Sequence, residues 1–131
     1  MDLLLDTHAF IWFMEGNLLL SNKARQAIEN PENKILISIT SLYEIAIKLK
    51  ISKIGFDKPI AAFFNDITEY NLTLIPISER HLITYEDIPL LPNHKDPFDR
   101  LIIATAITDK LSIISIDKQF KHYKELVSIL W

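Results

Sequence analysis

The sequence predicts an α/β fold, a three-layer α/β/α sandwich with a central parallel sheet. Short apolar runs alternate along the chain with segments whose apolar residues recur at helical spacing. The first run, Leu3-Leu4-Leu5, ends abruptly at Asp6, as expected of a central strand that is buried on both faces. No linker, internal repeat or low-complexity segment interrupts the 131 residues. We therefore expect a single domain over residues 1–131.

The expected strands and helices follow from these runs and from their start and stop signals. Strands are expected at 3–5, 35–39, 72–77, 111–116 and 127–130. Helices are expected at 7–13, 21–30, from 41, at 60–70 and at 78–85, with a short one around Phe120 and Tyr123. Gly16 closes the first helix, and Pro76 places the 72–77 strand at an edge or marks its end.

The segment 94–106 carries a further helix start, with Asp96 as cap and Pro97 at the first helical position. The helix that follows is apolar almost all round, so we expect it to be buried. Asp99 shares a side of this helix with Ile102 and Ile103. A carboxylate on a buried face must be paired, neutralised or bound to a cation, which indicates a functional site.

Composition limits the classes of protein that remain. The net charge of −3 argues against a generally basic nucleic-acid-binding surface, although it permits a local basic rim. The absence of cysteine excludes thiolate metal sites and is compatible with a reducing cytoplasm, the expected location. The N-terminus lacks a basic region and no apolar run is long enough to cross a bilayer, so we expect neither a signal peptide nor a membrane partner.

Four acidic residues, far apart in sequence, are expected at one edge of the sheet. Ligands of parallel sheets bind beyond the carboxyl ends of the strands. Asp6 and Asp117 follow two of the strands, Glu44 is expected in the first turn of the helix after the 35–39 strand, and Asp99 opens the long buried helix. Like charges gathered in this way repel one another unless a positive group lies among them.

This set of oxygen ligands suits Mg²⁺ or Mn²⁺ and predicts metal-assisted phosphodiester hydrolysis. Asp6, Asp99 and Asp117 are the candidate metal ligands, directly or through water, and Glu44 would bind the metal or orient the attacking water. The hydroxyls of Thr7 and Ser115 are candidate supporting groups, and Asp96 is a cap first and a fringe ligand second. The candidate phosphate contacts are Lys48, Lys95, Arg100 and Lys118.

Each of these residues also has a purely structural interpretation. Ser41 to Glu44 matches a capping box, and aspartate is common in turns and at helix starts. His8 and His94 could lie near the cleft, but solvated surface histidine is the simpler expectation. Trp12 is expected in the core rather than as a platform for nucleobases. The expected convergence of the acids at one edge of the sheet favours a functional site over these structural interpretations.

The chain resembles the PIN-domain ribonucleases, especially the VapC-like toxins of toxin–antitoxin pairs. The matching pieces are LLLDTHA (3–9), SITSLYEIAIK (38–48), HKDPFDRLIIA (94–104) and SID (115–117), in this order across nearly the whole chain. The resemblance implies Mg²⁺- or Mn²⁺-dependent cleavage of RNA by an acidic quartet. The matching residues are Asp6, Glu44, Asp99 and Asp117. It also implies a homodimer and inhibition by a small antitoxin protein.

Two alternatives remain open at this point. A non-catalytic module that acts only through a protein-binding surface is suggested by a second apolar stripe, Tyr43, Ile47 and Ile51. An aspartyl phosphotransferase would use Asp6 as its nucleophile. Haloacid-dehalogenase-like enzymes of that kind need a second aspartate two positions later, where this chain has His8.

Overall fold

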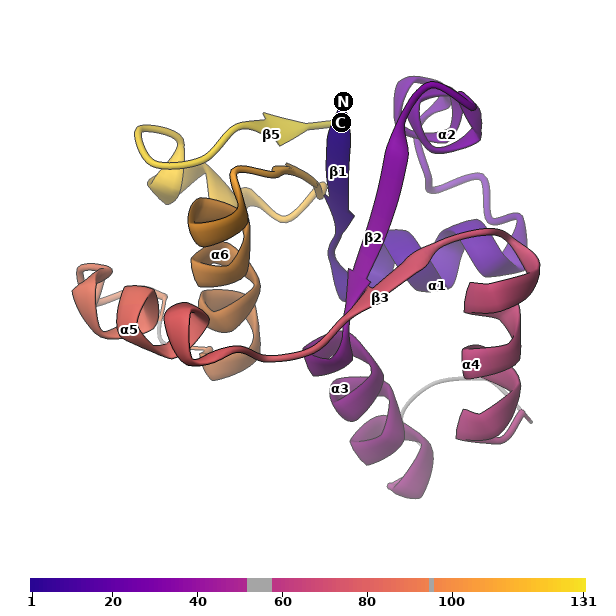
Figure 1. Cartoon of the computed structure of the whole chain (residues 1–131), viewed down its shortest axis with the longest axis horizontal. Helices are drawn as coiled ribbons and strands as arrows, with labels where there is room; N and C mark the ends of the chain where they lie inside the picture. Colours follow the sequence, from indigo (N-terminus) through magenta and orange to yellow (C-terminus); the bar gives the residue numbers. More distant parts are fainter. Residues whose placement is uncertain (52–57, 95) are drawn as a thin grey trace.

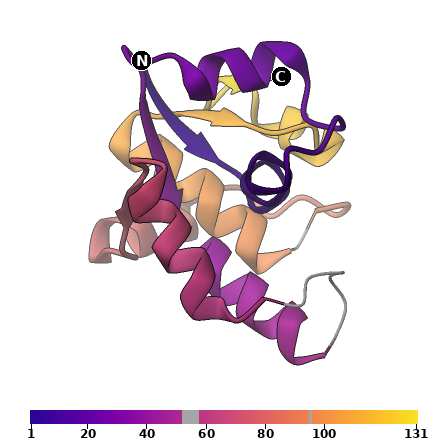
Figure 2. The ribbon, with the colours of Figure 1, turned by 90° about the vertical axis from the view of Figure 1, so that its right-hand side faces the viewer.

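The predicted three-layer α/β fold is confirmed by a computed structural model, which describes residues 1–51, 58–94 and 96–131 (Figure 1). Its centre is a sheet in which every pairing is parallel and the strand order is β3-β2-β1-β4-β5. The strands are β1 (Asp2–Leu5), β2 (Lys34–Ser38), β3 (Thr73–Ile75), β4 (Ser112–Ile114) and β5 (Ile129–Leu130). The strands fan out in the twist usual for such sheets (Figure 2). The run at 3–5 forms the central strand, as predicted.

Helices cover both faces of the sheet, because successive residues of each strand point to opposite sides. Leu3 and Leu5 face one core, built with α1–α4, whereas Leu4 faces the other, built with α5, α6 and η1. The helices are α1 (Thr7–Glu15), α2 (Asn22–Glu29), α3 (Ile39–Lys50), α4 (Ile60–Glu69), α5 (Glu79–Asp87), α6 (Pro97–Asp109) and the 3₁₀ helix η1 (Lys118–Tyr123). Within the described residues, none of these helices has the length and apolar character needed to span a bilayer.

The start of α3 differs from the prediction. The strand β2 ends at Ser38, and α3 begins at Ile39, two residues before the expected start at Ser41. The Ser38 hydroxyl caps the helix by accepting a hydrogen bond from the Thr40 amide at 3.0 Å. Glu44 therefore lies in the second turn of α3, and the predicted capping box from Ser41 to Glu44 is wrong. Glu44 is therefore not a capping residue of α3.

Arg100 is a structural residue, so its predicted contact with RNA phosphate is wrong. Its side chain is buried, and its guanidinium donates hydrogen bonds to the carbonyl oxygens of Pro89 (2.9 Å) and Ile88 (3.1 Å). The guanidinium also lies over the Tyr85 ring, 5.0 Å from its centroid. A planar group with several donors can satisfy both carbonyls at once, which fixes the segment between α5 and α6 against α6.

Candidate functional site

Asp6 follows β1 directly, at the edge where the carboxyl ends of the parallel strands meet. Its carboxylate caps α1 by accepting a hydrogen bond from the Ala9 amide at 2.7 Å. The side chain of Ser115, in the segment after β4, lies close enough to Asp6 to stabilise its charged form. Because β1 and β4 are neighbours in the sheet, their two carboxyl ends place these groups side by side. Asp6 is 5% exposed, an unusual position for a carboxylate.

Asp117 lies two residues after Ser115, in the same segment that follows β4. Its carboxylate caps η1 by accepting a hydrogen bond from the Gln119 amide at 2.9 Å. The Asp117 amide donates to the Ser115 hydroxyl at 3.0 Å. Ser115 therefore lies beside both Asp6 and Asp117, and its supporting role in a metal site stays a prediction.

Glu44 reaches the same region from α3. The Thr7 hydroxyl lies 2.7 Å from Glu44 Oε1 and 2.9 Å from the Ser41 hydroxyl, and Lys48 Nζ lies 3.1 Å from Glu44 Oε2. The Thr7 hydroxyl thus donates a hydrogen bond to Glu44, and its supporting role in a metal site stays a prediction. Lys48, predicted as a phosphate contact, pairs with a carboxylate here, and its contact with RNA stays a prediction.

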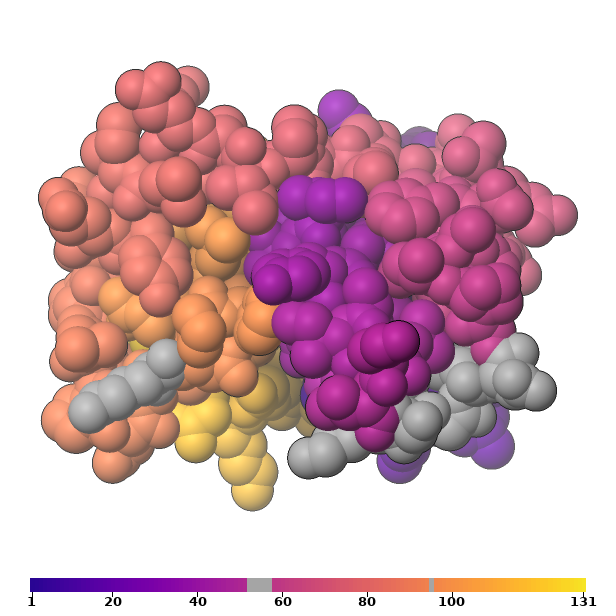
Figure 3. Space-filling model, turned by 90° about the horizontal axis from the view of Figure 1, so that it is seen from below, coloured from indigo at the N-terminus to yellow at the C-terminus, as the bar shows by residue number. Residues whose placement is uncertain are grey.

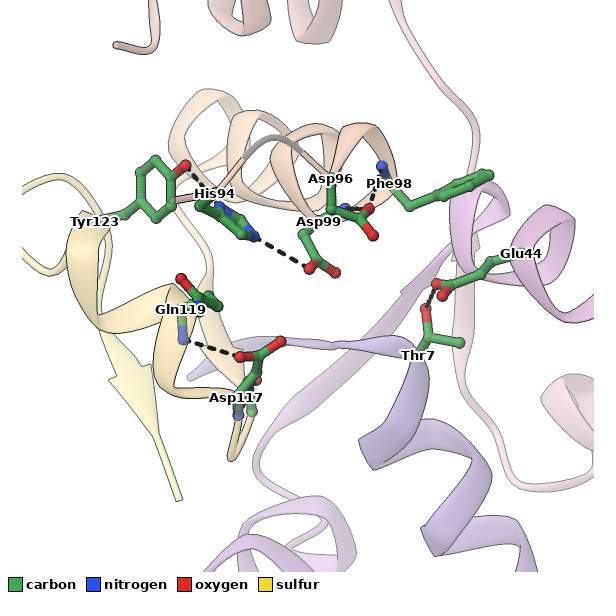
Figure 4. Close-up of polar contacts among 10 residues, drawn as sticks. Thr7, Glu44, His94, Asp96, Phe98, Asp99, Asp117, Gln119 and Tyr123 are labelled. Carbon is green, nitrogen blue, oxygen red and sulfur yellow. Dashed lines mark hydrogen bonds and ion pairs between the residues drawn. The ribbon is translucent and has the colours of Figure 1, made fainter. Parts of the chain in front are cut away.

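Asp99 occupies the first turn of α6 and is held by His94. The ring nitrogen Nε2 of His94 lies 3.2 Å from Asp99 Oδ2, and Nδ1 lies 2.8 Å from the Tyr123 hydroxyl (Figure 4). His94 is buried, so the expectation of a solvated surface histidine is wrong. Sequence reasoning missed this contact, because Tyr123 lies 29 residues from His94 and no local pattern joins the two.

The remaining predicted residues have simpler positions. Asp96 is an exposed cap of α6, whose carboxylate accepts hydrogen bonds from the amides of Phe98 (2.9 Å) and Asp99 (3.1 Å). The cap prediction for Asp96 is therefore confirmed. Lys118 is exposed on η1. Lys95 lies outside the described residues.

The carboxylates of Glu44, Asp99 and Asp117 turn toward one space bounded by α3, α6 and η1 (Figure 4). Seen from the carboxyl edge of the sheet, the surface is hollowed between α3 and the residues around α6 (Figure 3). Asp6 joins this group, since the charges of Asp117 and Glu44 both act on it. Asp6, Glu44 and Asp117 thus lie within electrostatic reach of one another, and the predicted four-acid site stays a prediction.

Crowding and burial alter the acidity of two of these groups. Burial raises the pKa of Asp6 from its usual 3.8 to about 6, and the charges of Asp117 and Glu44 add to the rise. Hydrogen bonds from Ser115 and the Ala9 amide oppose it. Burial also raises the pKa of Asp99 to about 6, with the charges of Asp96 and Asp117 adding and the hydrogen bond from His94 opposing. Strongly raised carboxyl pKa values in a hollow are typical of functional sites.

The oxygen atoms of these side chains are suitable ligands for a divalent cation, but they do not form a preformed metal site. Carboxylate and hydroxyl oxygens are the ligands that Mg²⁺ and Mn²⁺ prefer. Among the described residues, however, no three acidic or histidine side chains converge into a group that could by itself hold a metal ion. Mg²⁺ usually keeps several of its waters, so carboxylates spaced around a hollow can hold it partly through water. Asp6, Glu44, Asp99 and Asp117 are the residues that could do so.

Comparison with known proteins gives consistent matches. Residues 3–126 match the PIN domain family. Ribonuclease VapC22 of Mycobacterium tuberculosis is 28% identical over 122 residues, which cover 92% of this chain and 91% of the relative. The fold is similar to VapBC2 of Rickettsia felis bound to a promoter DNA fragment, with a TM-score of 0.70, 19% identity and coverage of 99% and 98% of the two chains. DNA-bound VapBC of Salmonella typhimurium gives a TM-score of 0.68 at 15% identity, with coverage of 99% and 97%.

The raised pKa of Asp6 predicts a pH-dependent effect of the substitution Asp6→Asn. Because the folded-state pKa of about 6 exceeds the usual 3.8, the folded protein binds more protons than the unfolded chain between these values. The contribution of Asp6 to stability therefore falls as the pH rises through this window, by up to about 3 kcal/mol. Asparagine removes the charge but keeps an oxygen for the Ala9 amide. Relative to the parent, the variant should gain stability between pH 4 and 7.

Urea unfolding in buffer containing EDTA measures this gain. Asp2→Asn is the matched control, because Asp2 begins the same strand and is exposed. A difference between Asp6→Asn and the parent that is equal at pH 4 and pH 8 would contradict the burial of a costly charge.

Proposed function

This chain belongs to the PIN domain family, and we propose that it is a metal-dependent endoribonuclease, the toxin of a toxin–antitoxin pair. The observation that carries the proposal is that the carboxylates of Glu44, Asp99 and Asp117 turn toward one space at the carboxyl edge of the sheet, with the charges of Asp117 and Glu44 acting on the buried Asp6. The similarity to a protein named Ribonuclease VapC22 supports RNA as the substrate.

The roles we propose follow from the positions of the side chains. A bound Mg²⁺ or Mn²⁺ ion would supply a nucleophilic water near neutral pH and neutralise charge on the phosphate. Asp6 and Asp117 follow neighbouring strands and both lie beside Ser115, and Asp99 turns toward the hollow from α6. Glu44, held by Thr7, binds the metal or orients the water. Burial is the main cause of the raised pKa values of Asp6 and Asp99, repulsion from neighbouring carboxylates adds to it, and a bound cation would favour the charged forms.

The proposed partners are an antitoxin and a second copy of the chain. Several solved structures with this fold are VapBC complexes, and one is described as a toxin–antitoxin complex from Klebsiella pneumoniae (TM-score 0.64). On α3, Tyr43 is 62% exposed, and Ile51 just beyond the helix is 55% exposed. The second apolar stripe of α3 is therefore not deeply buried and offers a surface for a protein partner.

Replacing a carboxylate of the hollow by its amide should abolish most of the activity. Asp6→Asn and Asp99→Asn are each expected to lower the rate of RNA cleavage at least about a hundredfold, because an amide is a poor ligand for a divalent cation. The measurement is gel analysis of structured RNA, with Mg²⁺ or Mn²⁺ and with EDTA, using protein freed of any partner.

Asp2→Asn, at the opposite end of β1, serves as the control and should cleave as the parent does. If all three variants cleave equally fast, the activity arises elsewhere and the proposal fails. A parent protein that is folded but inactive under every metal condition favours the non-catalytic module. A covalent phosphate on Asp6 after exposure to a phosphate donor would instead support the phosphotransferase.

Metal binding can also be detected without activity. Saturating Mn²⁺ should raise the Tm of the parent by about 2–6 °C, since a ligand that binds only the folded state stabilises it by mass action. The double variant Asp6→Asn/Asp99→Asn should lose most of this rise in differential scanning calorimetry. A Tm in the parent that does not respond to Mn²⁺ or Mg²⁺ would argue against a metal at this hollow.

The proposed homodimer predicts a mass near twice 15.2 kDa. Light scattering after size-exclusion chromatography measures this mass directly, at several protein concentrations. A mass of one chain throughout the concentration series would refute the dimer without affecting the proposed chemistry.

A further inference from the structure

Beside the acidic site, the chain forms a second hollow of about 360 Å³. It lies between the end of β4, η1 and the outer strand β5, and it is lined by Ser115, Ile116, Lys121, Ile129 and Trp131. This volume is within the range of pockets that take small ligands. Its lining combines an aromatic ring, aliphatic side chains and one lysine, so it suits a flat ring attached to a negatively charged group.

The wall of this hollow is shared with the acidic site. Ser115 is 2% exposed, lines the hollow, and contacts both Asp6 and Asp117. A molecule in the hollow would thus lie one side chain away from two of the candidate metal ligands. The hollow therefore adjoins the acidic site across Ser115.

Trp131 is held in a defined position within this lining. Its ring meets the Trp12 ring edge-on, with centroids 6.0 Å apart and an interplanar angle of 65°. Trp12, from α1, also packs against the core, as expected from the sequence. The Trp131 ring is half-buried and fixed on one side, which leaves it available on the side of the hollow. An ordered indole is a good platform for a nucleobase.

The adjoining helix η1 carries the charge that a nucleic acid needs. Residues 118–124 read KQFKHYK, with three lysines and no acidic residue in a chain whose net charge is −3. Lys118, Lys121 and Lys124 are all exposed, and none forms an ion pair with another described residue. Lysines on one exposed segment beside a cleft are typical contacts for phosphates.

We infer that this hollow is a nucleotide subsite for single-stranded RNA. One base stacks on Trp131, and the adjacent phosphates contact Lys118 and Lys121 along η1. The inference rests on the proposed function, which it deepens by assigning the path of the strand on one side of the cleaved phosphate. Single-stranded rather than paired RNA is specified, because a base must leave its helix to enter the hollow.

The test measures binding of a fluorescent single-stranded RNA oligonucleotide to the Asp6→Asn protein, which is expected to leave the RNA largely uncleaved. In this background Trp131→Ala should raise the Kd at least about fivefold, the effect of losing one stacked base. Lys121→Ala should weaken binding and lower the slope of log Kd against log salt by about 0.7, as expected for one phosphate contact on a single strand. The matched control is Lys34→Ala, at the amino edge of the sheet, which should change neither quantity.

A second measurement guards against misfolding of Trp131→Ala. RNA should quench the indole emission of the Asp6→Asn protein, and the conservative variant Trp131→Phe should lose most of this quenching while keeping most of the affinity. Quenching that persists in Trp131→Phe, or Trp131→Ala and Lys121→Ala proteins that bind like Lys34→Ala, would overturn the subsite. Neither result depends on the proposed chemistry, which is tested separately by comparing RNA cleavage by the parent and by the Asp6→Asn protein.

Discussion

The burial of carboxylates beside one another is the constraint on which the carboxyl edge of this structure depends. A parallel sheet delivers every strand end to the same side, and here the ends of β1 and β4 carry Asp6 and Asp117. The protein offsets the resulting charge with short-range donors. Ser115 and the Ala9 amide stabilise the charge of Asp6. Glu44 is contacted by Thr7 and Lys48, and Asp99 is contacted by His94. These donors only partly offset the burial and the neighbouring charges, because the pKa values of Asp6 and Asp99 remain raised to about 6.

The chemistry proposed for this edge and the charge around it belong together. A cleft lined by acids repels a polyanion unless cations intervene, and the proposed metal supplies them inside the cleft. Outside the cleft, the lysines of η1 would attract the RNA strand, although the protein chain as a whole is acidic. A net charge of −3 is therefore no argument against RNA when the charges are separated in this way.

The sequence predicted the fold well because its signals are local. The run at 3–5, the closing Gly16 with φ of 65°, and the Asp96-Pro97 helix start each act within a few residues. The proximity of Asp6 and Asp117 could also be predicted, since each follows one of two neighbouring parallel strands. What failed depends on distant partners. His94 is buried because it meets Tyr123, and Arg100 because it serves the carbonyls of Ile88 and Pro89. The start of α3 was placed two residues late because either Ser38 or Ser41 can cap a helix.

The outermost strands have a consequence for how copies of the chain can associate. The strands β3 and β5 contain three and two residues, so each edge of the sheet offers few unpaired backbone groups. Longer exposed edges invite strand-to-strand joining between molecules, which leads to fibrous aggregates. The short edge strands therefore disfavour assembly by extension of the sheet. The helical faces, where side chains rather than backbone groups select the partner, offer more surface for a specific complex.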